Sequence, residues 1–142
     1  MISDAISRIA WKLKRVVEEI AEERGDVDFA ALLLREDSPG RWDFVLGARW
    51  LKDAGREVYE YVTEKLKRGL SPEELLQISR TVLLDRADPA LARIAAVKEV
   101  GPGQLNTNGN PGEFMGIRFT SAVFLVVHQP HRRFAQAGRS SG

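Results

Sequence analysis

The feature that most constrains the fold is a turn motif between two apolar segments. Residues 29–34 are apolar at every position, which is typical of a strand covered on both faces. Residues 41–48 alternate between large apolar side chains and smaller or polar ones, which predicts a strand with one exposed face. The residues between them, 37–40, read Asp-Ser-Pro-Gly and suit a tight turn. The sequence therefore predicts an antiparallel hairpin.

A long amphipathic helix is predicted ahead of this hairpin. Apolar residues recur every three or four positions along residues 3–24, which places them on one helical face. Ser3 can cap the first amides, with Asp4 at the positive end of the helix dipole. Gly25 can adopt the left-handed conformation that ends many helices.

Helices and strands alternate after the hairpin. Helical spacing returns over residues 53–68, and Ser-Pro-Glu-Glu at residues 71–74 is a capping box that predicts a short third helix. Residues 81–84 read as a brief buried strand. A further helix is expected to begin at Asp88 and to end at residues 101–103, which read Gly-Pro-Gly.

The last part of the chain is predicted to complete a sheet. Residues 104–113 are rich in Asn, Gly and Pro and allow only a short edge strand, whereas residues 121–128 form a β-rich run. Residues 129–142 are polar and basic, so we expect a flexible tail. The order of elements predicts an α+β domain over residues 1–128, with helices packed on one mixed, largely antiparallel sheet.

Part of the chain resembles a group of small bacterial proteins of unassigned function. The similarity covers Ala31 to Leu46, Leu70 to Leu76 and Val82 to Asp85, which is about the middle third of the chain. These residues are those of a hairpin, a capped helix and a buried strand, so what is shared is architecture. The resemblance implies a bacterial, intracellular protein.

Composition excludes several classes of function. Lys and Arg total 21 against 20 Asp and Glu, so no overall basic field favours nucleic acid or acidic membranes. The chain has no cysteine, which excludes disulfides, a thiol nucleophile and cysteine-based metal sites. The start of the chain lacks the features of a signal peptide, and its longest late apolar run, residues 122–127, is too short to span a membrane. We therefore expect a cytoplasmic protein.

Two groups of residues offer the ligand types of a metal site. Glu36, Asp37 and Asp43 surround the predicted hairpin turn, and three carboxylates can bind Mg²⁺ in a hydrolase or nuclease. Turn geometry explains Asp37, and the exposed face of its strand explains Asp43, so we favour a solvated turn. His128 and His131 flank a proline and precede two arginines, which disfavours a cation site. No catalytic residue, metal or cofactor is assigned.

The loop of residues 101–116 contains five glycines but lacks the order of a phosphate-binding loop. Its Asn106, Asn108 and Asn110 could hydrogen-bond a ligand, although asparagines in turns usually stabilise the turn itself.

Basic side chains gather in two stretches. A nucleic-acid-binding module would use them to contact phosphate, but four glutamates follow directly on the helix, so a mixed solvated face is favoured. The basic residues are Arg8, Lys12, Lys14 and Arg15 on the first helix, and Arg132, Arg133 and Arg139 in the tail.

Trp11 is the candidate for contact with a protein partner. It lies opposite the mean direction of the apolar face of the first helix, so we expect it on the polar face beside Arg8 and Arg15. Tryptophan is enriched among the residues that dominate interface energies. The alternative for Trp11 is a ring that lies flat on the helix surface beside Arg8 and Arg15 or under the C-terminal tail. The interpretation that we carry forward is a non-enzymatic protein-interaction domain that pairs with its own copy as a homodimer. A metal-dependent hydrolase and a nucleic-acid-binding module remain as alternatives.

Overall fold

The computed structural model describes residues 4–94, 99–101, 103–109 and 111–128. The predicted cap at Ser3 and the predicted tail, residues 129–142, lie outside this range. The elements are α1 (Asp4–Arg24), β1 (Phe29–Arg35), β2 (Trp42–Ala48), the 3-10 helix η1 (Arg49–Leu51), α2 (Arg56–Gly69), α3 (Pro72–Leu75), β3 (Ile78–Asp85), α4 (Pro89–Ile94), β4 (Asn106–Asn108), β5 (Gly112–Phe114) and β6 (Ile117–Val127). The predicted α+β class is confirmed.

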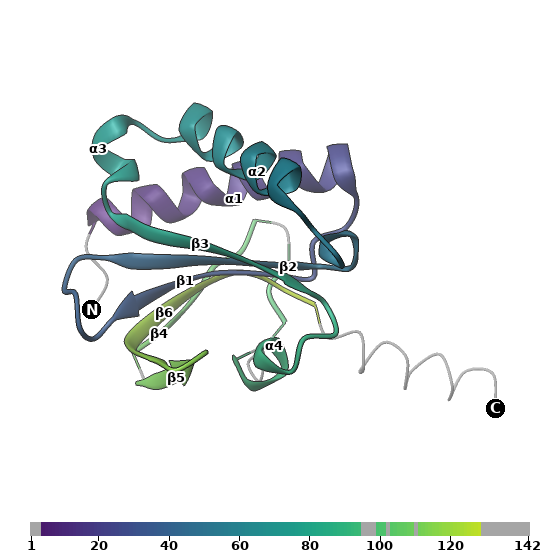
Figure 1. Cartoon of the computed structure of the whole chain (residues 1–142). Helices are drawn as coiled ribbons and strands as arrows, with labels where there is room; N and C mark the ends of the chain where they lie inside the picture. The colour runs from purple at the N-terminus through teal and green to yellow at the C-terminus, as the bar shows by residue number, and fades with distance from the viewer. Residues whose placement is uncertain (1–3, 95–98, 102, 110, 129–142) are drawn as a thin grey trace.

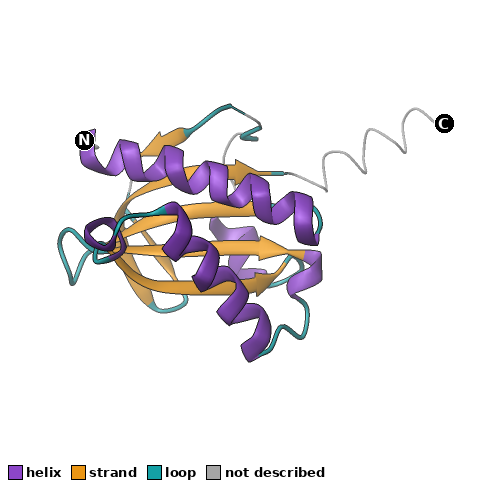
Figure 2. Ribbon diagram, turned by 90° about the horizontal axis from the view of Figure 1, so that it is seen from above, coloured by secondary structure: helices purple, strands orange, loops and turns teal. Residues whose placement is uncertain are grey.

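One mixed sheet with helices on both sides forms the body of the molecule. Its strand order is β3-β2-β1-β6-β4, and β5 pairs with β6 off this path. All pairs are antiparallel except β2 with β3, which are parallel because the chain crosses over through α2 and α3 between them. Helices α1 and α2 cover one face, and α4 and β5 lie on the other side (Figures 1 and 2).

The main core lies between the sheet and helices α1 and α2. The apolar face of α1 buries Leu13 and Ile20 completely, and α2 adds Val62. The facing sheet positions are alternate residues of β1 and β2, such as Leu32 and Phe44. Burial of one such side chain contributes about 1.5–3 kcal/mol, so this layer supplies much of the driving force for folding.

A second apolar cluster lies on the opposite face, under α4. It contains Phe29, Phe124 and Leu91, with the two phenylalanine rings edge to face at 6.0 Å. Gly47 on β2 permits this packing, because a Cβ there would stand 2.5 Å from Leu91 Cδ1. Glycine at this position lets α4 approach the sheet closely.

Two local predictions are confirmed in detail. The hairpin pairs β1 and β2 from Phe29 opposite Gly47 to Leu34 opposite Trp42, and Gly40 in its turn has φ +81°. In the capping box, the Ser71 hydroxyl accepts from the Glu74 N–H, and the Glu74 carboxylate accepts from the Ser71 N–H.

Two expectations about exposure are wrong. Every residue of β2 is buried, because the second cluster and two arginines cover the face that we expected to be solvated. Strand β3 runs from Ile78 to Asp85 and is only partly buried except at Leu84, because it lies at the edge of the sheet.

The last strand begins at Ile117, four residues before the predicted start at Ser121.

Candidate functional site

Strand β3 forms one edge of the sheet. This strand has eight residues, and among the residues that the structure places it pairs only with β2. An edge strand presents a row of backbone N–H and C=O groups without partners, which makes it a template for another strand. Natural proteins usually blunt such edges with short strands or covering segments. Within the described part of the chain, no strand pairs with the outer side of β3.

The pairing register shows which backbone groups of β3 face outward. The Arg86 N–H donates to the Ala48 carbonyl at 3.2 Å, at the end of the β2–β3 ladder. In a parallel ladder only alternate residues bond to the neighbouring strand, so residues 82 and 84 point their backbone groups at β2. Thr81 and Leu83 therefore direct both N–H and C=O away from the sheet.

Two exposed apolar side chains flank this edge. Leu76 precedes the strand and has 74% of its surface exposed, and Tyr59 on α2 has 45% exposed. Tyr59 also lines a hollow with Leu83 of β3. The β3 edge thus combines open backbone groups with apolar surface.

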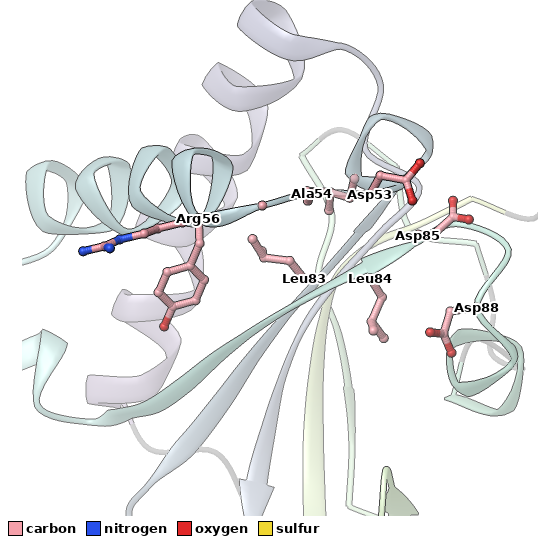
Figure 3. Close-up of a pocket in the computed structure, with 10 residues that line it drawn as sticks. Asp53, Ala54, Arg56, Leu83, Leu84, Asp85 and Asp88 are labelled. Atoms are coloured by element: carbon pink, nitrogen blue, oxygen red, sulfur yellow. The ribbon is translucent and has the colours of Figure 1, made fainter.

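The hollow beside Tyr59, which we call the β3 hollow, lies at the carboxyl end of β3. It has a volume of about 560 Å³ and is bounded by the loop before α2, by the start of α2 and by residues 83–88. Figure 3 shows carboxylates of Asp53, Asp85 and Asp88 on one side and Arg56 extending away from them. Ligands of parallel sheets commonly bind at the carboxyl ends of the strands, and the sequence prediction did not single out these residues.

Trp11 lies near the opposite edge of the sheet. Its side chain has 44% exposed, which confirms the predicted position on the polar side of α1, and Arg8 and Arg15 are exposed as well. The covered part of Trp11 lines a hollow of about 490 Å³ with Val100 and residues 103–106. Trp11 therefore faces this hollow from the side of α1.

Lys14 departs from the predicted basic surface. Its side chain is 2% exposed, and Nζ donates to the carbonyls of Gly101 at 2.6 Å, Gln104 at 2.6 Å and Leu125 at 2.5 Å. Burial lowers the pKa of the Lys14 ammonium, and the nearby Glu18 carboxylate raises it to a smaller extent. Lys14 shares a helical face with Ala10 and Val17, a signal that the sequence carried and that we missed.

The neighbouring Lys12 is also engaged, in an ion pair with Glu74 of α3 at 2.9 Å. Of the predicted basic stretch on the first helix, Arg8 and Arg15 are exposed, Lys12 is partly exposed and Lys14 is buried. The stretch is therefore no continuous phosphate-binding surface. The basic residues predicted in the tail lie beyond the part of the chain that the structure describes.

Asp43 is buried rather than solvated, which corrects the expectation from strand alternation. It lies between two arginines of the adjacent strands, with Arg80 Nε 3.0 Å from Oδ2 and Arg35 Nη1 3.5 Å from Oδ1. Asp43 Oδ1 and Arg80 Nη2 are buried without a hydrogen bond. This charge network links β1, β2 and β3 across one face of the sheet.

The other two hairpin carboxylates have arginine partners as well. Asp37 accepts two hydrogen bonds from Arg35, at 2.9 and 3.0 Å, which hold the pKa of the Asp37 carboxyl below its usual range. Glu36 lies 3.7 Å from Arg118 of β6. Within the described ranges, no group of three or more His, Asp or Glu side chains is arranged to hold a metal ion.

The remaining candidates are spread over the sheet edge. Asn106 and Asn108 begin and end β4, and Asn110 lies outside the described residues, as does His131. The backbone N–H of His128 donates to the Asp28 carbonyl at 2.8 Å. The structure does not bring His128 together with carboxylates as a ligand set in the part of the chain that it covers.

Comparisons with protein-family models, with curated proteins and with solved structures found no match for this chain. None of the helices in the described ranges is long and apolar enough to cross a membrane. The geometry of the β3 edge and its surroundings is therefore the basis for a proposed function.

Proposed function

We propose that this chain is a protein-interaction domain that binds an extended polypeptide segment along the edge of β3. The observation that carries the proposal is the outward direction of the backbone groups of Thr81 and Leu83 at the edge of the sheet. Addition of a strand to an open edge is a common mode of peptide recognition, in which the main chain supplies affinity and flanking side chains supply specificity.

The energetics favour a segment that is long enough to reach the flanking side chains. A backbone hydrogen bond contributes about 0.5–1.5 kcal/mol net, so the bonds at Thr81 and Leu83 alone would not overcome the cost of association. Apolar contact with Tyr59 and Leu76 adds burial at both ends of the edge. We place this activity in the cytoplasm, which the absence of cysteine supports.

A synthetic probe tests strand addition. The probe is a peptide of alternating Thr and Val, N-methylated at alternate residues so that only one of its edges can pair. At low micromolar protein, its addition should slow the amide hydrogen exchange of Thr81 and Leu83 about tenfold or more, because these N–H groups gain acceptors. Unchanged exchange at both amides, at a probe concentration on the order of 1 mM, would contradict the proposal.

Two proline variants locate the binding edge. Thr81→Pro removes an outward donor and places a ring on the edge, so binding of the probe should be lost. Thr107→Pro places the same ring in β4 at the other edge and should leave binding unchanged. An equal loss of probe binding in both variants would show that the probe does not bind at the β3 edge.

Trp11 defines the rival surface. Its exposed part, together with Arg8 and Arg15, supports a protein contact on α1. Binding of the partner there should be weakened by Trp11→Ala and should be indifferent to Thr81→Pro. Because β3 presents backbone groups for pairing as well as flanking apolar side chains, we favour the β3 edge.

A further inference from the structure

We infer that the occupant of the β3 edge is β3 of a second copy of this chain, in antiparallel pairing about a two-fold axis beside Val82. The inference rests on the proposed function and names its partner. A strand that pairs with its own copy in antiparallel orientation closes a symmetric dimer and leaves no further β3 edge open. The product is one continuous sheet across two copies.

The register follows from the backbone groups that face outward. With Val82 opposite Val82 of the second copy, Thr81 lies opposite Leu83, and Leu83 lies opposite Thr81. Each of these two residues has both N–H and C=O free of β2, so each pair exchanges two hydrogen bonds. This register uses every fully outward residue of the strand.

Neighbouring registers are less favourable at particular residue pairs. Centring on Thr81 would place Leu83 opposite Ser79, which lies where the β2–β3 register shifts beside Trp42 and Asp43. Centring on Leu83 would pair Thr81 with Asp85, whose carbonyl already accepts from the Asp88 N–H at 2.9 Å. The latter register also places Arg80 opposite Arg86, and like charges directly opposite are destabilising.

Side-chain pairs agree with the Val82 register. Val82 would contact its own copy, and Arg80 would lie opposite Leu84 while it keeps its ion pair with Asp43 at 3.0 Å. On the other face Ser79 would lie opposite Asp85, which brings a hydroxyl donor to a carboxylate. No like charges face one another among these pairs.

The flanking surfaces are complementary in the same orientation. Leu76 precedes the strand by two residues, and the β3 hollow lies around residues 83–88 at the other end. Antiparallel pairing about Val82 brings the exposed Leu76 of one copy toward the carboxyl end of β3 of the other copy, where the β3 hollow lies. The most exposed large apolar side chain of the described residues is thus placed beside a hollow of about 560 Å³.

A cysteine scan tests the register, because the natural chain has no cysteine. Val82→Cys places two thiols in a non-hydrogen-bonded antiparallel pair, where Cα atoms are about 4.5 Å apart and a disulfide can form. Thr81→Cys and Leu83→Cys are matched controls, because their thiols would be diagonal neighbours at about 7–8 Å, beyond disulfide reach. Trp11→Cys tests the rival contact on α1.

Under mild oxidation, Val82→Cys should give roughly tenfold more disulfide-linked dimer on a non-reducing gel than any of the other three variants. Preferential cross-linking of Thr81→Cys, Leu83→Cys or Trp11→Cys would overturn the Val82 register. If none cross-links and the probe peptide still protects Thr81 and Leu83, self-pairing is wrong and strand addition stands. If the probe also fails, both proposals are wrong.

Discussion

The two edges of the sheet differ in how their backbone groups are covered. Beyond β1, the long strand β6 is covered by the three residues of β4 and by a bridge between Val100 and Val127. Strand β3 at the other edge has eight residues and no such cover among the residues described. The same sheet thus protects one edge and presents the other.

The covered edge is held by a buried charge. We call residues 99–101 and 103–108 the edge cover; its carbonyls at Gly101 and Gln104, with that of Leu125 on β6, accept from the Lys14 ammonium. Trp11 packs beside the same segment. Because α1 anchors the edge cover through Lys14, β6 is unavailable to a partner, and this contrast supports β3 as the binding edge.

The largest expected effect comes from removing the charge that holds the edge cover. Lys14→Met should leave three carbonyls, of which that of Leu125 is buried, without their ammonium donor and lower the free energy of unfolding by about 2–4 kcal/mol. Hydrogen exchange should rise most in the edge cover and least in β1. An equal rise in all strands would show that Lys14 stabilises the whole core rather than one edge.

Lys12→Met is the matched control for this variant. It removes the same charge two residues away, from an ion pair with a 41% exposed lysine side chain. Exposed ion pairs contribute about 0–1 kcal/mol, so its unfolding free energy should change little. A loss as large as that of Lys14→Met would contradict the special role of the carbonyl contacts.

A somewhat smaller effect is expected where the open edge is attached to the sheet. Asp43→Asn leaves Arg80 and Arg35 without a buried anion and should lower the unfolding free energy by about 2 kcal/mol. Amide hydrogen exchange should increase more in β3 than in β1. The control Asp37→Asn changes an exposed carboxylate, so the free energy of unfolding in urea should change little. An equal loss of unfolding free energy in the two variants would show that the Asp43–Arg80 ion pair does not hold β3 to β2.

Sequence patterns predict the individual helices and strands better than they predict the order of the strands in the sheet. Spacing and caps within about 20 residues are local signals, so α1, the hairpin and the box at Ser71 were foreseen. The edge position of β3 depends on the crossover through α2, which no local pattern encodes. Asp43 occupies a position in the strand alternation that predicts exposure to solvent. Its burial depends on an ion pair with Arg80, which lies on a strand far away in the sequence.

The candidate site was foreseen only in part. Trp11 was placed on the correct side of α1, whereas Tyr59, Leu76 and the outward groups of β3 were not considered, because their exposure follows from tertiary packing. Lys14 was assigned to the solvent from its charge alone, although its helical position faces the core.

Trp11→Ala tests whether self-association uses the covered edge or the β3 edge. Trp11 belongs to the covered edge, so its truncation should cost about 1 kcal/mol of stability and should leave self-association unchanged. Sedimentation equilibrium of the variant beside wild type measures this directly. A dimer that weakens tenfold in Trp11→Ala would move the interface to α1.

The smallest effect is a pH dependence at the covered edge. Burial lowers the pKa of Lys14 below its ordinary value of 10.5, so the unfolded chain binds more protons than the folded chain between the two pKa values. The unfolding free energy contributed by Lys14 should therefore rise with pH across that window and be lowest below it. Urea unfolding should show this alkaline slope in wild type and a flatter slope in Lys14→Met. Identical slopes would contradict it.

Sedimentation equilibrium of wild type and Thr81→Pro up to about 500 μM decides whether β3 is the dimer interface. We expect a reversible wild-type dimer and a variant that stays monomeric with nearly unchanged thermal unfolding, because proline at Thr81 removes only an outward donor. A wild type that is monomeric throughout this range, or a Thr81→Pro dimer as stable as that of wild type, would contradict pairing through the β3 edge.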